Sequence, residues 1–384
     1  RVEERRVNWE ILDAWRDAAE ECGIKKINEF NRGDNSGNSY FQMNQHKGSR
    51  WSATKAYLRP IISRKNLTVL TYAHVKKIRI ETSDRVKVAK GVVASINKSN
   101  AKFFSAKKEV ILCAGSIGSP QILQLSGVAD KALLEKMGIP LIHELKGVGE
   151  NLHDHLQIRS VYEVQNTITL NQRINSFFGK IKMGLEYFIF KTGPLTMPPS
   201  QLGAFAKSDP SQMTANMEWH VQPLSLDKFG DPLHSFNAIT PAVCNLRPTS
   251  RGHVRIKTSD SYDYPAITLN YLSTPEDEAI AVSGLKFTRK IMSANALKKF
   301  NPEEILPGKK IESDKDLLDA ARNLGTTIFH PVGTCKMGSD LFSVVNDRLQ
   351  VHGIKNLRVV DASIMPRITS GNTNAPTVMI AEQG

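Results

Sequence analysis

Three short motifs near the carboxyl end constrain the fold of this chain more than any other part of its sequence. His330 precedes a Gly-rich turn, a strand-like run at 357–360 ends at Asp361, and an Asn-Ala-Pro-Thr segment at 374–377 opens a stretch that reads as a helix. Small residues after a strand, such as Ala362, let a ligand approach the backbone closely. The tail therefore predicts an α/β fold with a ligand-binding site at the end of a strand.

The segment around Asn374 has the signs of a helix start. Thr373 or Asn374 is a candidate N-cap, and Pro376 fits an early helical position. A helix N-terminus carries about half a positive charge and unpaired N–H groups, so it favours an anion. Reduced flavin is anionic at the edge formed by its N1 atom and C2 carbonyl. These motifs predict a flavin site in which His330 and Asn374 share one substrate hydroxyl, and Asp361 can hold a sugar or pyrophosphate group.

Four separated stretches carry a resemblance to a known family. Besides the tail, they are 48–58, 66–75 and the long block 109–154, which contains Cys113-Ala114-Gly115-Ser116-Ile117-Gly118-Ser119-Pro120-Gln121-Ile122-Leu123-Gln124-Leu125-Ser126-Gly127-Val128. The sequence resembles the glucose-methanol-choline (GMC) oxidoreductase family, and most of all its insect glucose dehydrogenase-like (FAD, quinone) branch. One departure is Ala129, which stands where the family's second signature ends in glycine.

The resemblance implies an enzyme that uses FAD to oxidise an alcohol or a sugar at a CH–OH group. His330 would act as general base on the hydroxyl while hydride passes to flavin N5, a role that suits a histidine with a pKa of about 6.5. Asn374 stands where the family has a second His or an Asn, and it would orient the hydroxyl. The implied electron acceptor is a quinone or oxygen, and the implied location is extracellular.

The resemblance also assigns the cofactor contacts. The backbone at Val75 would meet the adenine, Ala114 and Gly115 would form the turn of close approach, and Asp361 with Ala362 would face the pyrophosphate. The complete set of implied cofactor contacts is Val75, Ala114, Gly115, Asp361, Ala362, Asn374, Ala375 and Thr377.

The predicted fold class is α/β plus α+β. An incomplete FAD-binding Rossmann-like domain is expected from 48–155 and 326–384, and a substrate domain with an antiparallel sheet backed by helices from 156–325. Residues 1–47 are expected to form a connector or lid with a surface helix. Family members open with a Gly-x-Gly-x-x-Gly turn, which this sequence lacks, so we expect a fragment without the N-terminal dinucleotide-binding segment.

Hydrophobic spacing and turn residues predict the individual elements. Helices are expected at 5–21, 117–125, 277–291 and 314–323, and strands at 66–80, 91–96 and 108–113. The three strands read as a small antiparallel excursion that returns to a parallel strand.

Composition excludes several classes of protein. The net charge of +13 is spread over scattered pairs such as Lys25-Lys26 and Lys76-Lys77, which favours a solvated basic surface over nucleic-acid binding. The sequence contains no uninterrupted run of about twenty apolar residues, so no membrane-spanning helix is predicted. The four cysteines are far apart and form no C-x-x-C pair, so neither a zinc site nor a disulfide framework is indicated.

Other readings remain open beside the oxidoreductase. The same family scaffold hosts a cyanohydrin-cleaving lyase with a structural flavin, and the chain fits a noncatalytic remnant or binding protein as well. His153 and His155 have the spacing of metal ligands, but no third ligand is evident, and no metal is expected. The stretch 115–119 lacks the G-x-S-x-G order of a serine hydrolase.

Overall fold

The computed structural model describes residues 1–228 and 230–384, which group into two compact units. Unit 1 comprises Arg1–Thr68, Leu156–Asn245 and Pro275–Thr326, and unit 2 comprises Val69–His155, Leu246–Thr274 and Thr327–Gly384. Both the α/β and the antiparallel parts of the predicted fold class are confirmed. No helix in the part of the chain that the structure describes is long and apolar enough to cross a membrane.

These units divide the chain differently from the expected domains at two places. Residues 48–68 belong to unit 1, not to the part that contains 69–155. The segment 246–274 belongs to unit 2, because its backbone is bound to the side chain of Gln124. The Gln124 amide donates to the carbonyl of Val254 (2.8 Å) and accepts from the N–H of Ile256 (2.9 Å).

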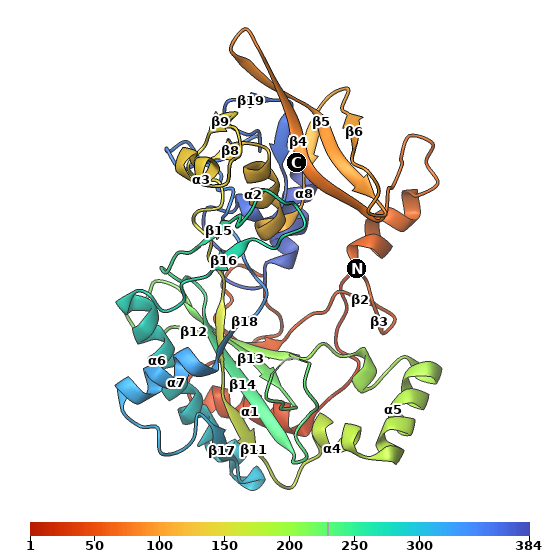
Figure 1. The fold of residues 1–384 in the computed structure, drawn as a ribbon. Coiled ribbons are helices and arrows are strands. Elements are labelled where there is room, and N and C mark those ends of the chain that lie inside the picture. The colour runs from red at the N-terminus through yellow and green to blue at the C-terminus, as the bar shows by residue number, and fades with distance from the viewer. Residues whose placement is uncertain (229) are drawn as a thin grey trace. The chain divides into compact units, whose positions relative to one another are not determined.

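An eight-stranded sheet forms the centre of unit 1 (Figure 1). Its main path runs β1-β12-β13-β14-β10-β18, and β11 pairs with both β14 and β17. The pairs β1–β12, β12–β13, β13–β14, β14–β10, β14–β11 and β11–β17 are antiparallel. The bounds are β1 Gly37–Tyr40, β10 Leu156–Arg159, β11 Val161–Glu163, β12 Leu202–Ala206, β13 Met217–Gln222, β14 Ala238–Asn245, β17 Glu303–Leu306 and β18 Gly325–Thr327. The antiparallel sheet predicted within 156–325 is therefore confirmed.

Helices surround this sheet, and two of them match the sequence prediction closely. The helices of unit 1 are α1 Glu10–Glu21, α4 Leu170–Asn175, α5 Phe177–Phe190, α6 Pro275–Met292 and α7 Asp314–Leu324. The unit also contains the short helices η1 Thr54–Leu58, η2 Arg59–Ile61, η3 Pro194–Thr196 and η4 Asn295–Phe300. Strands β2 Gln45–His46 and β3 Ser49–Arg50 form a separate hairpin. Helices α6 and α7 confirm the predictions at 277–291 and 314–323. Acidic residues open α6 and basic residues close it, as the helix dipole favours.

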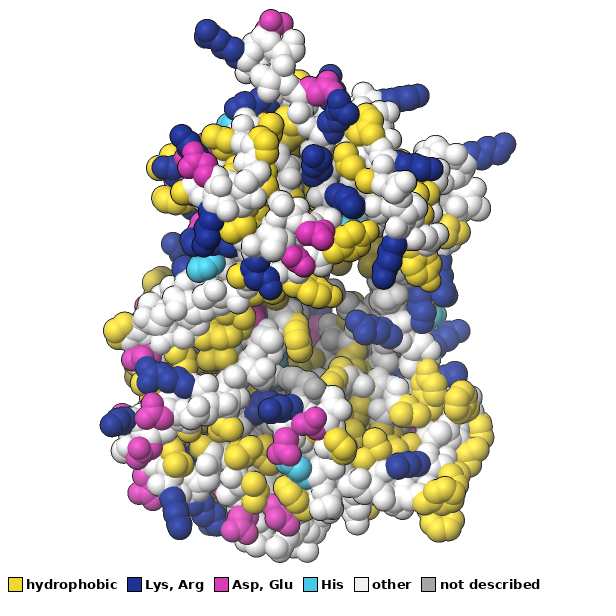
Figure 2. Space-filling model, viewed as in Figure 1, with side chains coloured by type: hydrophobic (Ala, Val, Ile, Leu, Met, Phe, Trp, Pro, Cys, Tyr) yellow, Lys and Arg dark blue, Asp and Glu magenta, His cyan; other side chains and the backbone are white. Residues whose placement is uncertain are grey.

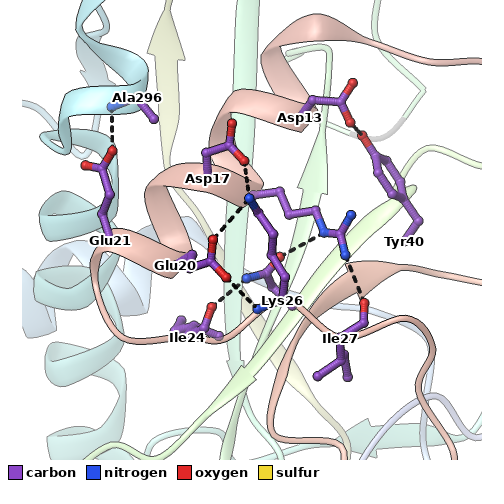
Figure 3. Close-up of polar contacts among 11 residues, drawn as sticks. Asp13, Asp17, Glu20, Glu21, Ile24, Lys26, Ile27, Tyr40 and Ala296 are labelled. Carbon is purple, nitrogen blue, oxygen red and sulfur yellow. Dashed lines mark hydrogen bonds and ion pairs between the residues drawn. The ribbon is translucent and has the colours of Figure 1, made fainter.

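Helix α1 is fixed from both sides. Its apolar face, which includes Leu12 and Trp15, is fully buried in the core of unit 1. On its polar side, Lys26 lies between Asp17 and Glu20, and Glu21 accepts from the backbone N–H of Ala296 at 3.1 Å (Figure 3). The helix begins later than the sequence predicted.

The start of α1 is set by the backbone of one residue. Trp9 is extended, with φ −132° and ψ 120°, and it occupies the N-cap position before Glu10. The predicted start at Arg5 is therefore wrong by about one helical turn, although the apolar spacing that suggested the helix is real.

Unit 2 is built from small sheets. Strands β4 Ala73–Ser83, β5 Val86–Ile96 and β6 Lys102–Ser105 are antiparallel, and β19 Ile354–Lys355 joins β5 in parallel. Strands β7 Val110–Leu112 and β20 Leu357–Val359 pair in parallel, β8 Val128–Ala129 pairs with β9 His143–Glu144, and β15 His253–Arg255 pairs with β16 Ala266–Thr268. The predicted antiparallel excursion and its return to a parallel strand are confirmed.

The helices of unit 2 follow the strand ends. They are α2 Gly115–Leu125, α3 Lys131–Lys136, η5 Ala362–Ile364 and α8 Asn374–Gln383. The strand predicted from 66 begins only at Ala73, because Tyr72 is left-handed with φ 54° and an extended strand cannot pass through it. The core of this unit gathers Leu123, Val332 and Val359, which are all fully buried.

Candidate active site

His330 lies in unit 2 between β18 and the Gly-rich turn, and 9% of its surface is exposed. Both ring nitrogens have a neighbour with which they can share a hydrogen. Its Nδ1 lies 3.1 Å from Nδ1 of His155, and its Nε2 lies 3.3 Å from the amide nitrogen Nδ2 of Asn372. The histidine predicted from the sequence therefore stands in a network of side chains rather than alone.

The partners of His155 determine which nitrogen of His330 carries a proton. Nε2 of His155 lies 3.1 Å from the carbonyl oxygen of Leu246, which only accepts, so this Nε2 bears hydrogen. In neutral His155 the Nδ1 atom is then an acceptor, and His330 must donate to it from its own Nδ1. The Nε2 atom of His330 is left with its lone pair, which accepts from Asn372. This tautomer is the one that a general base requires.

Asp154 fixes the backbone on both sides of this histidine pair. Its Oδ1 accepts from the backbone N–H of His155 (2.9 Å) and of His330 (2.8 Å). Its Oδ2 accepts from the hydroxyls of Thr327 (2.5 Å) and Tyr271 (2.6 Å). Four donors saturate one buried carboxylate, which holds the two segments that carry the histidines at one separation.

Tyr271 contributes as a permanent donor to that carboxylate. Burial, and then the negative charge of Asp154, raise the pKa of the Tyr271 hydroxyl far above its usual value. The phenol stays protonated throughout the range in which a protein is handled, so its hydrogen bond to Asp154 does not depend on pH.

The residue before His330 has an unusual backbone. Phe329 has φ 65°, a left-handed conformation that is uncommon for a bulky residue and costs on the order of 1 kcal/mol. Its N–H donates to the hydroxyl of Thr327 at 2.8 Å, so the bend is held by the same residue that contacts Asp154. The bend sets the direction in which the His330 ring leaves the chain.

A second cluster lies where β7 and β20 end. Oδ2 of Asp361 accepts from the backbone N–H of Gly115 (2.9 Å) and the hydroxyl of Ser119 (2.5 Å). Oδ1 accepts from the backbone N–H of Ser363 (2.8 Å) and its hydroxyl (2.5 Å). The carboxylate thus joins the starts of α2 and η5. Because both oxygens already accept two bonds, Asp361 shapes the turn rather than offering an open acceptor to a ligand.

Gly115 opens α2 in a conformation that favours glycine. Its φ is 75°, and the position that a Cβ would occupy meets nothing within 4 Å. Ala114 is exposed beside it, and Ala362 is half-buried. Small residues with open space above a strand end and a helix start match the predicted approach of a pyrophosphate.

The first turn of α8 presents backbone donors. Thr373, one of the two candidates from the sequence, occupies the N-cap, yet no described side chain caps the helix start. Asn374 and Ala375 are exposed there, so their N–H groups lie at an accessible positive end of a helix. Together with the turn at Gly115, this arrangement fits FAD.

The remaining predicted contacts have other surroundings. Val75 is half-buried in β4 opposite Ala94, and its role at the adenine stays a prediction. The hydroxyl of Thr377 donates to the carbonyl of Thr373 at 2.7 Å, so it serves the helix itself. Asn374, predicted to face the substrate with His330, stands two residues after Asn372, which is the amide that contacts His330.

The ring nitrogens of His153 and His155 make hydrogen bonds in this structure. Nδ1 of His153 lies 2.7 Å from the carbonyl oxygen of Asn151, and its Nε2 accepts from the backbone N–H of Ile368 at 2.9 Å. Burial, and then the charge of Arg251, lower the pKa of His153 to about 4, so the ring is neutral at pH 7. Among the described residues, no group of three or more His, Cys, Asp or Glu gathers as metal ligands.

Sequence reasoning missed the residues that position His330. The sequence singles out His155 only through its metal-like spacing from His153, and it predicts Asn374, not Asn372, beside His330. The signal was available in the alternation of 153–155, where a carboxylate between two histidines is typical of a hydrogen-bonded network as well as of a metal site. The partners themselves come from distant segments and are not visible in the sequence.

Comparison with known proteins identifies the family. Models of the GMC oxidoreductase family match residues 2–157 and residues 248–381. An alcohol dehydrogenase [acceptor] of Pseudomonas putida is 39% identical over 366 residues, covering 95% of this chain and 66% of that protein. An oxygen-dependent choline dehydrogenase of Escherichia coli O9:H4 is 40% identical over 337 residues, covering 88% of this chain and 60% of that protein. The chain belongs to the GMC oxidoreductase family, and FAD is the cofactor that this membership indicates.

Solved structures agree with that assignment. Pyridoxine 4-oxidase from Mesorbium loti has a TM-score of 0.86 at 25% identity over 99% of this chain and 70% of that one. Formate oxidase has the same fold, with a TM-score of 0.89 at 24% identity over 97% of this chain and 69% of that one. The chain spans about two thirds or less of the curated relatives named above. The narrower resemblance to insect glucose dehydrogenases stays a prediction.

Proposed function

We propose that the protein is an FAD-dependent oxidoreductase that oxidises an alcohol at its CH–OH group, with His330 as general base. The observation that carries the proposal is the hydrogen-bond chain from Leu246 through His155 to His330. That chain places the proton of neutral His330 on Nδ1. The lone pair of Nε2, which accepts from Asn372 in this structure, can then take a hydroxyl proton when a substrate displaces that amide.

Each part of the site would have its own role in the reaction. Nε2 of His330 takes the hydroxyl proton, and the imidazolium that forms is stabilised because its Nδ1–H already donates to His155. Asn374 orients the hydroxyl and cannot act as a base. Bound FAD supplies the hydride acceptor. The N–H groups at the start of α8 would favour the negative charge of the reduced cofactor.

The substrate class rests on two supports of different kinds. The two curated relatives are named for an alcohol and for choline, which favours an alcohol as substrate. The sequence resemblance to the insect branch adds a sugar such as glucose. A quinone or oxygen would then receive the electrons.

The test follows flavin absorbance in the purified full-length protein during anaerobic addition of an alcohol and sugar panel. Substrate should bleach the flavin, and His330→Ala should slow bleaching by about 10²- to 10⁴-fold with flavin still bound. His352→Ala is the matched control, because that half-buried histidine contacts the carbonyl of Gly338 and no residue of the site.

Three results would overturn the proposal. Turnover without any flavin bleaching would identify a lyase that uses flavin structurally. A full-length protein that binds no flavin would identify a noncatalytic remnant. Bleaching at an unchanged rate in His330→Ala would remove His330 from the chemistry.

A further inference from the structure

Helix α5 of unit 1 has an unusual surface, because it turns large apolar side chains toward solvent. Of its fourteen residues only Met183 is buried. The exposed apolar side chains are Phe177 (72%), Phe178 (79%), Ile181 (46%), Leu185 (56%), Phe188 (75%), Ile189 (64%) and Phe190 (67%). Figure 2 shows hydrophobic side chains gathered over this helix. A surface helix of a globular protein normally has the opposite arrangement.

Most of these side chains form one stripe along the helix. At about 100° per residue, Phe178, Ile181, Leu185 and Phe188 follow each other at i, i+3, i+7 and i+10, and Phe177 and Ile189 flank them. The stripe covers roughly 120° of the circumference, and Met183 lies on the other side of the helix. The helix therefore has one face for its own unit and a separate apolar face without cover in the described chain.

Lysines border this stripe on both sides. Lys180 and Lys182 are exposed, and helical geometry places them at opposite edges of the apolar face. Lys191 follows the helix, with its ammonium 4.4 Å from the ring centroid of Tyr187 and 5.5 Å from that of Phe188. The single acid of the helix, Glu186, accepts from the hydroxyl of Thr192 at 3.3 Å. Cations thus dominate the rim of an apolar surface.

The helix is already formed and held at both ends. The hydroxyl of Ser176 accepts from the N–H of Gly179 at 3.2 Å, and Lys191 ends the helix in a left-handed conformation with φ 55°. A Cβ at Gly179 would lie 2.1 Å from the carbonyl oxygen of Arg173, so the turn into α5 leaves no room for a larger residue. Binding through this face needs no prior folding.

We propose that α5 docks on an anionic phospholipid bilayer, lying in the plane of the interface with its phenylalanine stripe among the acyl chains. An apolar stripe bordered by lysines is the pattern of an interfacial helix, and the lysines complement anionic headgroups. A second copy of the chain is a poorer occupant, because a two-fold contact would bring Lys180 and Lys182 of both copies together. The net charge of +13 opposes self-association further.

The test is co-sedimentation of the purified full-length protein with vesicles. Vesicles of phosphatidylcholine mixed with phosphatidylserine should carry the protein into the pellet, and vesicles of phosphatidylcholine alone should bind it more weakly. The double variant Phe178→Ser/Phe188→Ser should lower the partition coefficient about tenfold or more for each ring removed. The double variant Lys180→Gln/Lys182→Gln should lower it about thirtyfold on the anionic vesicles, since each lysine contributes a factor of about five.

The matched control variants remove exposed side chains of the same kinds outside α5. Tyr264→Ser removes an aromatic side chain that is 85% exposed outside α5, and Lys107→Gln/Lys108→Gln removes an adjacent pair of exposed lysines. Both controls should bind as the parent does. Because every altered side chain is exposed, circular dichroism should stay unchanged in all variants.

Several results would overturn the proposal. Absence of the parent protein from both vesicle pellets would exclude a bilayer as partner. Equal binding by the parent and Phe178→Ser/Phe188→Ser would assign the attraction to charge elsewhere. A dimer in sedimentation velocity that the same double variant dissolves, without vesicle binding by the parent, would make a second copy the occupant.

Discussion

The Nδ1 atoms of His155 and His330 lie 3.1 Å apart, with their rings at 83° to each other. A hydrogen bond between two imidazole nitrogens needs a proton on one of them and a lone pair on the other. The carbonyl of Leu246 decides which, because it draws the proton of His155 to the far nitrogen. A buried residue with no predicted role in the chemistry thereby sets the protonation state of the proposed base.

Replacement of His155 should expose that positioning role. His155→Phe removes the acceptor for the Nδ1–H of His330, so the proton is free to move to Nε2, where it blocks proton abstraction. We expect kcat to fall about 10- to 100-fold with a smaller change in KM. Steady-state kinetics with the best alcohol of the panel measures both constants.

The matched variant is His155→Gln, whose amide can still donate to Leu246 and accept from His330. It should recover most of the lost kcat. An equal loss in His155→Gln and His155→Phe would show that packing, and not the tautomer of His330, is what His155 provides.

Asn372 and Asn374 should differ in their effects. The amide of Asn372 occupies Nε2 of His330 at 3.3 Å, where a substrate hydroxyl has to bind, so it competes with the substrate. We expect Asn372→Ala to leave kcat within about threefold and to lower KM, and Asn374→Ala to lower kcat about tenfold or more. A larger loss of kcat in Asn372→Ala would make Asn372 the residue that orients the hydroxyl.

Gly115 should matter for cofactor binding more than for folding. In Gly115→Ala the φ of 75° costs on the order of 1 kcal/mol, and the new methyl group enters the open space where we place the pyrophosphate. Flavin affinity, measured by fluorescence quenching, should fall at least tenfold. Gly138→Ala is the control, because Gly138 has a similar φ of 66° and equally open space. Equal flavin affinity in both variants would show that the cofactor does not bind beside Gly115.

Local patterns in the sequence predicted the local parts of this fold. The apolar runs that became β7 and β20 and the helix that became α2 follow from a few consecutive residues. The placement of 246–274 in unit 2 does not, because it depends on Gln124, a polar side chain more than 120 residues away that binds the backbone of Val254. A glutamine inside a predicted helix gives no sign of such a distant contact.

The candidate site also contains parts that the local sequence predicts and parts that depend on distant contacts. His330 and the turn around Gly115 were recognisable from short motifs. The hydrogen bonds to Asp154 join three segments, and no pattern in the sequence indicates which donors a buried carboxylate will meet. The left-handed backbone of Tyr72 is equally hidden, since aromatic residues rarely adopt it.

The stability of the protein should decrease in mild acid because of His153. Burial and the charge of Arg251 lower the folded-state pKa of His153 to about 4, below the value of about 6.5 expected in the unfolded chain. The unfolded state therefore binds a proton first as the pH falls. The contribution of His153 is complete above pH 6.5 and disappears as the pH falls through 4, a change on the order of 3 kcal/mol. Urea unfolding between pH 7.5 and 4 should detect this loss of stability.

His153→Gln should be less stable than the parent at pH 7.5, because it lacks the ring nitrogen that accepts from the N–H of Ile368, and its stability should depend less on pH. The same slope in parent and variant would assign the acid sensitivity to other groups.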